Sequence, residues 1–449
     1  MFKEKYNEGK ILREITPRSS HAKLHLPLKR TPVERMISQS NEGRLPELVP
    51  IRHFRMGKSP FTFYRGTASL MANDLSCSPS TGVNIQACGD SHLMNFGGFA
   101  TPERTLIVDM NDFDETNPGP WEWDLKRLAA SFLLACREKG YSASDGHDVT
   151  MQLMQTYQQK IYEYSTMNFL DLWYSKLTLE EIAQNAKTKE GKALITKAVK
   201  KANEQTHDTV FYKITANTLG KIEITDHAPL IYHPIDVEEQ MAAILSFMDD
   251  YKSTLQNDRR QLLDQYKVVD VALKVVGVGS VGTRCMVVLL MNDNKEPLFL
   301  QVKEAGQSVL EPFTGKSKFQ HSGERVVQGQ RLIQSASDVF LGWAKDHTGR
   351  CFYLRQLRDK KMSPSIEEFN KTMLGGYATI CGNILARAHC KTGQGALICG
   401  YIGKGEVFAN AICKFSALYA DQTEKDYADF MKAIKDGVLT SRDDAPKDL

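Results

Sequence analysis

The sequence predicts an α+β protein in which a helix-rich region, a β-rich region and a second helical region follow one another. Apolar residues recur at helical spacing through much of residues 85–265. Between about 267 and 360 the pattern changes to short β-branched runs that are separated by turn residues. Helical spacing then returns in the last part of the chain.

The composition is that of an ordinary globular chain. Of 449 residues, 42% are hydrophobic, and 57 basic against 54 acidic side chains leave a net charge of +3, which gives no support for nucleic-acid binding. The first residues lack the apolar core of a secretory signal, and no apolar run approaches ~18 residues, so we expect no membrane span. The nine cysteines are scattered without a C-x-x-C pair, which predicts reduced thiols, no zinc site and a cytoplasmic location.

These patterns divide the chain into four segments. Residues 1–50 are polar and basic, so we expect a loosely ordered arm with one short helix near 32–39. Residues 51–265 carry the first polar motifs and most of the predicted helices, and 266–360 form a β-rich unit. Residues 361–449 return to helix.

Two short strand-like runs surround a polar loop early in the second segment. Residues 83–88 and 105–108 are apolar, and Gly97 with Gly98 between them predicts a turn. In the loop, Asp90 is followed five residues later by Asn95. Phosphoryl transfer requires a carboxylate beside the acceptor hydroxyl and an oxygen ligand for Mg²⁺, which this pair provides, although both residues are also common in plain turns.

A cluster of carboxylates follows the second strand-like run. Asp112 lies just beyond the apolar residues, and hard oxygen ligands at a strand end suit Mg²⁺. An acidic surface turn is the alternative, and it applies to Asp114 and Glu115 as well, which otherwise are candidates for a second metal. Residues 124–139 then predict a helix that stops at Gly140.

Further helices are expected over about 148–205 and 236–266. No motif in this helical stretch is typical of a known substrate site. We expect residues 140–265 to shape the pocket of whatever substrate the protein binds.

The β-rich segment predicts an antiparallel meander with a glycine-rich first turn. Runs at 268–276, 284–291 and 298–303 are separated by turn residues. A dinucleotide-binding fold would place a helix after the glycines, whereas a strand follows here, which favours a hairpin that covers phosphates over that fold. An ordinary hairpin remains the alternative. The candidate phosphate-binding residues are Gly277, Gly279, Ser280 and Gly282.

Lys303 ends the third of these strands. A lysine at the end of a largely apolar run is costly to bury unless it is paired. Glu324 follows 21 residues later inside a predicted helix over 322–336, and we expect it to be the partner of Lys303. A solvated lysine and a surface glutamate are the alternatives.

Together these features resemble the protein-kinase-like superfamily, in particular its aminoglycoside and choline phosphotransferase branch. That branch carries G-D-x-H-x-x-N, then I-D-F-x-x-A and D-L-A, and this chain has G-D-S-H-L-M-N at 89–95, N-D-F-D-E-T at 111–116 and W-D-L-K-R-L-A at 123–129. The twelve-residue step from Asp112 to Asp124 is similar to that branch, which favours Asp112 over Asp109 as the metal ligand.

The chain resembles more closely a bacterial family known only as a domain of unknown function. The shared strings include S-P-F-x-F-x-R-G at 59–66, N-D-F-D-E-T-x-P-G-P-W-E-W-D-L-K-R-L from 111 and R-Q-L-R-D at 355–359. The resemblance covers most of residues 50–440 and implies no reaction of its own.

The order of the motifs differs from that in kinases, where the glycine loop, lysine and glutamate precede the catalytic loop. Here the catalytic-loop motif comes first, by about 190 residues. The resemblance therefore implies a circularly permuted two-lobe kinase-like fold, in which 266–360 form the small lobe and 361–449 complete the large lobe. Active sites are recognised by geometry and roles, not by chain order.

The implied function is ATP- and Mg²⁺-dependent phosphoryl transfer to an unknown hydroxyl acceptor, either a small molecule or a protein, with Asp90 as the base. Transfer of AMP to a protein side chain and an ATP-binding scaffold without catalysis are the alternatives. Asp124 is expected to brace the catalytic loop, and Arg65 to form a structural ion pair or to contact an anionic acceptor. The expected site residues are the catalytic Asp90, Asn95 and Lys303, the nucleotide-binding Gly277, Gly279, Ser280, Gly282, Lys303 and Glu324, and the metal ligands Asn95 and Asp112.

Overall fold

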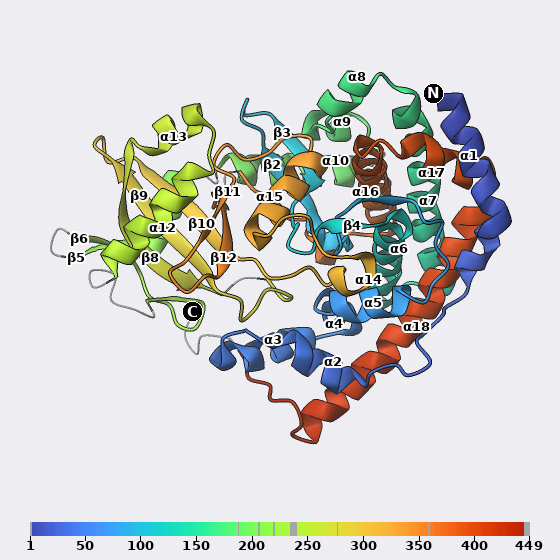
Figure 1. The fold of residues 1–449 in the computed structure, drawn as a ribbon, viewed down its shortest axis with the longest axis horizontal. Coiled ribbons are helices and arrows are strands. Elements are labelled where there is room, and N and C mark those ends of the chain that lie inside the picture. The colour runs from blue at the N-terminus through green and yellow to red at the C-terminus, as the bar shows by residue number, and fades with distance from the viewer. Residues whose placement is uncertain are drawn as a thin grey trace.

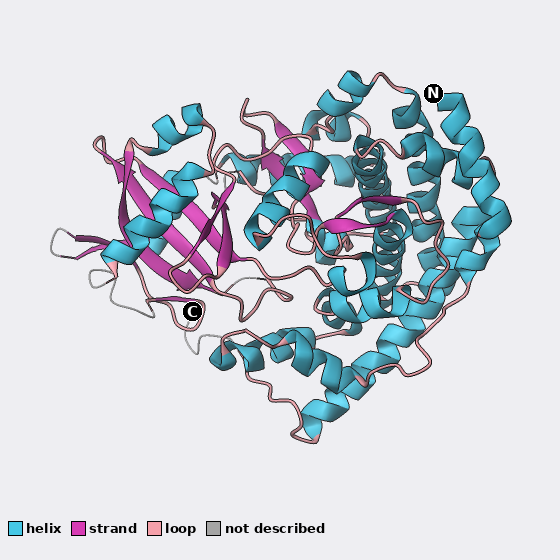
Figure 2. Ribbon diagram, viewed as in Figure 1, coloured by secondary structure: helices cyan, strands magenta, loops and turns pink. Residues whose placement is uncertain are grey.

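A computed structural model describes residues 2–186, 188–204, 207–218, 221–233, 240–275, 277–357 and 360–443. A six-stranded antiparallel sheet lies beside a body of long helices, and helix α15 (Ser322–Ile333) with two small two-stranded sheets lies between them (Figure 1). Figure 2 shows the strands of the large sheet on one side and most of the helices on the other. The predicted α+β class is confirmed. Among the described helices, none is both long and apolar enough to cross a membrane.

The large sheet contains the predicted meander. A strand does follow the glycine-rich turn, because β8 and β9 pair antiparallel on either side of it. Helix α12 (Met241–Ser253) packs on one face, where its residues share a hydrophobic cluster with alternate residues of the strands. In sheet order the strands are β11 (Gly342–Lys345), β12 (Cys351–Gln356), β10 (Pro297–Glu304), β9 (Cys285–Asn292), β8 (Tyr266–Lys274) and β7 (Ile231–Tyr232).

The opposite face of the sheet is polar where β10 and β12 meet. Lys303 lies directly opposite Tyr353, and Gln301 lies opposite Arg355. Directly opposed residues of an antiparallel pair project from the same face. These four side chains therefore point away from the α12 cluster and toward the helical body.

The helical body is built around α6 (Trp121–Glu138), which begins after Pro120 and is buried along nearly its whole length. Trp121 and Trp123 pack in its core. The helices around it are α7 (Ala143–Thr166), α16 (Lys371–Lys391), α17 (Gly395–Ile402) and α18 (Val407–Lys435).

The expectation of a loosely ordered N-terminal arm is wrong for its first part. Residues Phe2–Ile15 form helix α1, which packs along α17. Two glycines allow this close approach, because a Cβ atom on Gly9 would lie 2.1 Å from the Leu397 carbonyl oxygen and one on Gly400 would lie 2.0 Å from that of Tyr6. Helix α2 (Val33–Ser40) is the short helix that was expected near 32–39.

The turn predicted at Gly97 and Gly98 is also wrong, because both glycines lie within strand β2 (Phe96–Ala100). Strand β2 pairs with β3 (Leu106–Met110), and Gly98 exchanges backbone hydrogen bonds of 2.9 and 2.7 Å with Met362. A Cβ atom on Gly97 would lie 2.6 Å from the Met362 carbonyl oxygen. The glycines are therefore needed for close backbone packing, not for a turn.

Strand β1 (Asn84–Ala87) pairs with β4 (Asn117–Pro120), which the sequence pattern did not indicate. The expected helices over 148–205 are α7 and three shorter ones, and those over 236–266 are α12 and α13, with residues 234–239 outside the described part. The remaining elements are α3 (Val49–Met56), α4 (Pro60–Arg65), α5 (Ala68–Leu75), α8 (Phe169–Tyr174), α9 (Leu179–Gln184), α10 (Lys189–Asn203), α11 (His207–Ile214), β5 (Thr215–Thr218), β6 (Lys221–Ile224), α13 (Asn257–Leu263) and α14 (Glu311–Thr314).

Candidate functional site

The loop between β1 and β2 is held by the first turn of α6. The carboxylate of Asp124 accepts backbone hydrogen bonds from Cys88 at 2.7 Å and Gly89 at 3.0 Å, and its carbonyl oxygen accepts one from Ser91 Oγ at 2.6 Å. Gly89 has φ +85°, and a Cβ atom there would lie 2.2 Å from the Glu115 carbonyl oxygen. The bracing role expected of Asp124 is confirmed.

In this loop Asp90 forms an ion pair with an arginine that the sequence did not single out. Arg127, one turn after Asp124 in α6, donates from Nε to Asp90 Oδ1 at 2.5 Å. Burial raises the pKa of Asp90, and the Arg127 charge opposes that rise. The string D-L-K-R could have indicated this role of Arg127, because Arg127 lies three residues after Asp124 and residues three apart share a helix face.

His92 braces the loop. Its Nδ1 accepts a hydrogen bond from the Met94 backbone N–H at 3.2 Å, and its Nε2 lies 3.9 Å from Asp90 Oδ2. Burial lowers the pKa of His92 well below its usual value, so the ring is neutral at neutral pH.

Asn95 and Asp112 lie where the two small strands β2 and β3 meet. Asn95 donates from Nδ2 to the Asp90 carbonyl oxygen at 2.7 Å, which leaves its side-chain oxygen free to face another group. The Asn111 backbone N–H donates to the Asn95 carbonyl oxygen at 3.0 Å. The first contact closes the loop before β2, and the second joins that loop to the segment after β3.

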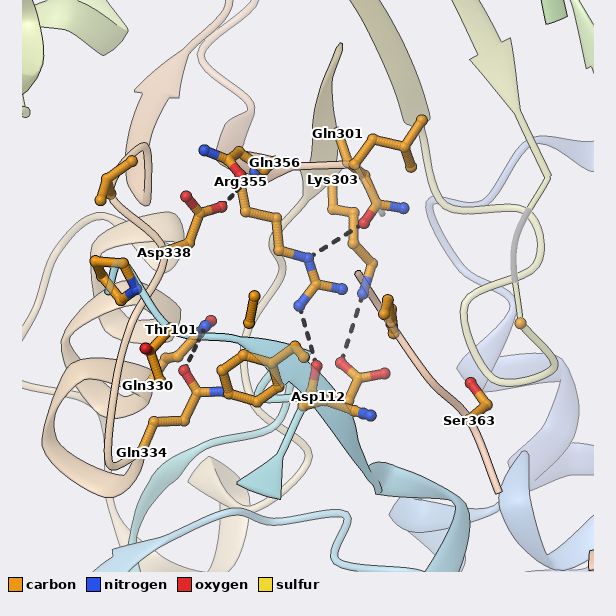
Figure 3. A pocket seen from close by; sticks show the side chains of 18 of the residues that line it. Thr101, Asp112, Gln301, Lys303, Gln330, Gln334, Asp338, Arg355, Gln356 and Ser363 are labelled. Atoms are coloured by element: carbon orange, nitrogen blue, oxygen red, sulfur yellow. Dashed lines mark hydrogen bonds and ion pairs between the residues drawn. The ribbon is translucent and has the colours of Figure 1, made fainter. Parts of the chain in front are cut away.

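Lys303 reaches this segment from the large sheet. Its Nζ lies 2.7 Å from Asp114 Oδ2 and 3.5 Å from Asp112 Oδ1, and Tyr353 donates to Asp114 Oδ1 at 2.6 Å. The Lys303 side chain is only 4% exposed. Figure 3 shows Lys303 directed at Asp112 with Arg355 and Gln301 beside it. Two segments about 190 residues apart therefore meet through buried charges.

The three charges shift one another's ionisation. Burial and then the Asp114 charge raise the pKa of Asp112. Burial acts in the same direction on Asp114, but Lys303 and the hydrogen bonds from Lys303 and Tyr353 outweigh it, so the pKa of Asp114 is lowered. Against the effect of burial, the two carboxylates raise the pKa of Lys303 well above its usual value. One lysine thus balances two carboxylates, and Asp112 is the less well compensated.

The expected ion pair between Lys303 and Glu324 is wrong. Among the described residues, the carboxylates paired with Lys303 are Asp112 and Asp114. The first turn of α15 lies over Phe352, since a Cβ atom on Gly323 would come within 2.2 Å of its carbonyl oxygen. Helix α15 packs on the face of the sheet that carries Tyr353 and Lys303, but its residue that reaches the site is Arg325, which donates to the Asp114 carbonyl oxygen at 2.8 Å.

Asp109, the competitor of Asp112, is fully engaged elsewhere. It is 0% exposed, and Arg387 Nη2 donates to both of its carboxylate oxygens, at 2.6 and 2.7 Å. Ser335 adds hydrogen bonds to Oδ2 from its backbone N–H and its hydroxyl, at 2.8 and 2.6 Å. This carboxylate therefore joins β3, α16 and the end of α15, and it is not among the described residues that line the two cavities at the site.

The glycine-rich turn approaches the same carboxylates. Gly277 and Gly282 have φ values of +67° and +90°, and Ser280 Oγ lies 3.5 Å from Asp114 Oδ2. The N-terminal segment holds the turn, because Arg44 donates to the Val281 carbonyl oxygen at 2.7 Å. The Leu45 backbone N–H donates to the Gly282 carbonyl oxygen at 2.8 Å.

Two cavities meet at this turn. The first, about 440 Å³, is lined by Lys303, Gln301 and Arg355 and extends along the sheet to the segment after β12 (Figure 3). The second, about 660 Å³, is lined by Asp90 and Asn95 and extends toward the N-terminal segment. In the described part of the chain, three residues line both cavities, namely Asp112, Gly277 and Ser280.

The residues that line the second cavity were only partly anticipated. Among the described residues, none between 140 and 265 lines either cavity, so the expectation that this stretch shapes the pocket is wrong. Residues between 36 and 69 form one side of the second cavity instead. The string R-Q-L-R-D could have indicated Arg355 as a residue of the site. Arg355 donates to the Asn111 carbonyl oxygen at 3.0 Å. Arg358 and Asp359 of the same string lie outside the described residues.

The sequence of this site lies within a region shared with other bacterial proteins. A family described as an uncharacterized protein conserved in bacteria (DUF2252) matches residues 44–433, which include both cavity-lining segments around Asp90 and Lys303. Comparison with curated proteins and with solved structures finds no match. The chain therefore belongs to this conserved bacterial family, DUF2252.

Proposed function

We propose that the protein is an ATP- and Mg²⁺-dependent phosphotransferase with a circularly permuted kinase-like fold, acting on a hydroxyl group. The observation that carries this proposal is the meeting of Asp112 and Lys303 where two cavities join. Asp90 lines one of these cavities and Lys303 lines the other. A phosphoryl donor and an acceptor require such an arrangement, with a metal ligand between them.

The order of elements in the sheet supports the kinase-like part of the proposal. The glycine-rich turn joins β8 to β9, Lys303 is in β10, and α15 lies between β10 and β11. Protein kinases likewise have a glycine-rich loop, a lysine on the third strand and a helix after it. The loop with Asp90 and Asn95 precedes the hairpin β2–β3, and Asp112 follows that hairpin. The two halves come in reversed chain order, which a circular permutation explains.

The donor set suits Mg²⁺ held jointly by the protein and a nucleotide. Among the described residues, no group of three or more His, Cys, Asp or Glu side chains is arranged to hold a metal. Mg²⁺ is commonly bound by one or two carboxylates with substrate phosphates, and Asp112 with the Asn95 oxygen provides such a partial set. The raised pKa of Asp112 indicates a carboxylate short of positive charge. When bound, Mg²⁺ would neutralise charge on the phosphates.

In this proposal Asp90 accepts the proton of the acceptor hydroxyl. The hydroxyl oxygen forms a bond to the γ-phosphorus of ATP while the bond to the β,γ-bridging oxygen breaks, and ADP leaves with that electron pair. Arg127 keeps Asp90 ionised and oriented. Lys303 and the backbone N–H groups of the glycine-rich turn would stabilise phosphate charge, the dominant contribution in this chemistry.

Labelled ATP tests the proposal. The protein is incubated with a small-molecule extract and with ATP labelled either at the γ- or at the α-phosphorus. Asp90→Asn is the inactive variant, and Arg137→Gln, near the end of α6, is the control. We expect γ-label in a new compound and a rate reduced about 10²–10⁴-fold in Asp90→Asn, because a positioned base contributes that much. Transfer of α-label would instead indicate AMP transfer, and binding without transfer of either label a scaffold; both would contradict phosphotransfer.

A further inference from the structure

Three arginines line the second cavity without a carboxylate partner. Arg44, Arg52 and Arg65 all border it, and among the described ion pairs none involves these side chains. Arg52 is 1% exposed and donates to Ser40 Oγ at 2.9 Å and to the Gly66 carbonyl oxygen at 3.0 Å. Its Nε atom has no hydrogen-bond partner. Three buried or half-buried guanidinium groups thus border the cavity without forming an ion pair among the described residues.

Arg65 is the most available of the three. It is the last residue of α4, its Nε atom is buried without a hydrogen-bond partner, and no ion pair is formed by its guanidinium group among the described residues. Burial lowers the pKa of Arg65, which means that its charge is poorly solvated. Buried charges are normally paired. An anion in the cavity would supply the missing partner.

The carboxylates that line the same cavity form their ion pairs and hydrogen bonds with other groups. Asp90 is paired with Arg127, and Lys303 is paired with both Asp112 and Asp114. Glu304 is paired with Arg284 at 3.2 Å. The carboxylate of Glu115 accepts a hydrogen bond from the Val309 backbone N–H at 2.7 Å, and Glu42 is exposed.

The position of the arginines separates them from the nucleotide end of the site. None of them lines the first cavity, where Lys303 lies, whereas all three share the second cavity with Asp90. Arg65 and Asp90 line this cavity together, and Asp90 is the carboxylate that most strongly opposes the lowering of the Arg65 pKa by burial. A molecule that presents a hydroxyl to Asp90 would therefore have its remaining groups among the arginines.

We infer that the acceptor is a small hydroxylated molecule that carries a phosphate or carboxylate group, which Arg65 binds while the hydroxyl lies at Asp90. The cavity volume of about 660 Å³ is that of a small-molecule site. Arginine recognises both anions through paired N–H donors. This inference rests on the proposed function for the hydroxyl, but the anion site itself does not require ATP.

The anion site is tested without nucleotide. Inorganic phosphate and malonate are titrated by calorimetry into the wild-type protein, Arg65→Met, Arg65→Lys, Lys303→Met and the surface control Arg137→Met. We expect at least one anion to bind. Its affinity should fall about 10–100-fold in Arg65→Met, because charge-assisted hydrogen bonds are lost, and partly recover in Arg65→Lys. Binding of phosphate alone or of malonate alone would identify which anionic group the site takes.

Two outcomes would overturn the inference. One is that neither anion binds. The other is that binding persists in Arg65→Met but disappears in Lys303→Met, since that would place the anion at the nucleotide end. The two proposals can fail separately. Transfer of γ-label to an uncharged hydroxyl compound would support the phosphotransferase function and overturn only the inference that the acceptor is anionic. Anion binding without any transfer of label would contradict the phosphotransfer alone.

Discussion

At Asp90, burial and an arginine act on one carboxylate in opposite directions. Burial raises its pKa, and the Arg127 guanidinium, 2.5 Å away, limits that rise. A base must be ionised to accept a proton. The proposed activity is therefore present above the pKa of Asp90 and is lost as the pH falls through that value.

Arg127→Gln should shift the acid limb of the pH–rate profile upward. Without the arginine the pKa of Asp90 rises further, and an opposite charge at this distance is worth about 1–3 pH units. We expect half-maximal kcat/KM at a pH higher by about that amount, measured by γ-phosphoryl transfer from pH 4.5 to 9. Arg137→Gln, on the exposed side of the same helix, should leave the limb in place. An acid limb that does not move in Arg127→Gln would contradict Asp90 as the base.

The residues of the site differ in how far the sequence could predict them. Asp90, Asn95 and Asp112 come from local motifs, and their contacts through residues 88–112 are local as well. Lys303 was predicted as buried and paired, but its partner was not, because Asp112 and Asp114 reach it from the segment after β3, and the α15 residue that contacts this segment is Arg325 and not Glu324. The three arginines of the second cavity, Arg44, Arg52 and Arg65, lie at the site because residues 36–69 pack near the turn around residue 280. No local sequence pattern predicts that contact.

At the scale of elements, the glycine-rich turn requires backbone conformations that only glycine adopts easily. Gly277 has φ +67° and lines both cavities, and Gly349, in the turn between β11 and β12, has φ +84° and lines neither. A Cβ atom on either residue would meet no atom within 4 Å. The two positions are therefore matched in strain and differ in proximity to the site.

Gly277→Ala and Gly349→Ala should each destabilise the protein by ~1–2 kcal/mol, the cost of a left-handed residue with a side chain. Only Gly277→Ala should weaken Mg-ATP binding, because only this turn would contact phosphates. Urea unfolding measures the first effect and calorimetry the second. Equal Mg-ATP affinities in the two variants would contradict the role of the turn.

Strand β3 and helix α16 are joined by the buried ion pair of Asp109 with Arg387. Arg387→Met would leave a fully buried carboxylate without its cation, so we expect the free energy of unfolding to fall by ~3–5 kcal/mol. Arg137→Met removes a partly exposed pair with Asp421 and should cost less than ~1 kcal/mol. Urea unfolding compares the two. A similar small loss in both variants would contradict the structural role assigned to Asp109.

Elements with strong periodicity were predictable, whereas elements made possible by glycine contacts were not. The strands β8, β9 and β10 and the helix α6 follow from apolar spacing and turn residues. Helix α1 was missed because residues 1–50 are polar and basic, and strand β2 was missed because Gly97 and Gly98 suggested a turn. In the structure the glycines of both elements allow backbones to approach within distances that any side chain would prevent.

At the scale of the whole molecule, the helical body and the sheet meet along a line of charged contacts at the site. Asp112 and Asp114 belong to the helical side, Lys303 and Tyr353 to the sheet, and Arg355 donates to the Asn111 carbonyl oxygen between them. A ligand bound in the first cavity would touch both parts. The central claim is therefore that the two parts form one Mg-ATP site.

The most direct test is a calorimetric titration of Mg-ATP into the wild-type protein, Asp112→Asn and Lys303→Met, with Lys267→Met as a control on the exposed side of the sheet. The account predicts Mg²⁺-dependent binding in the wild type and the control, and affinities lower by about 10-fold or more in both site variants, because each loses a charged contact. Binding that is absent from the wild type, or that is unaffected by both site variants, would contradict the claim that these two segments form one nucleotide site.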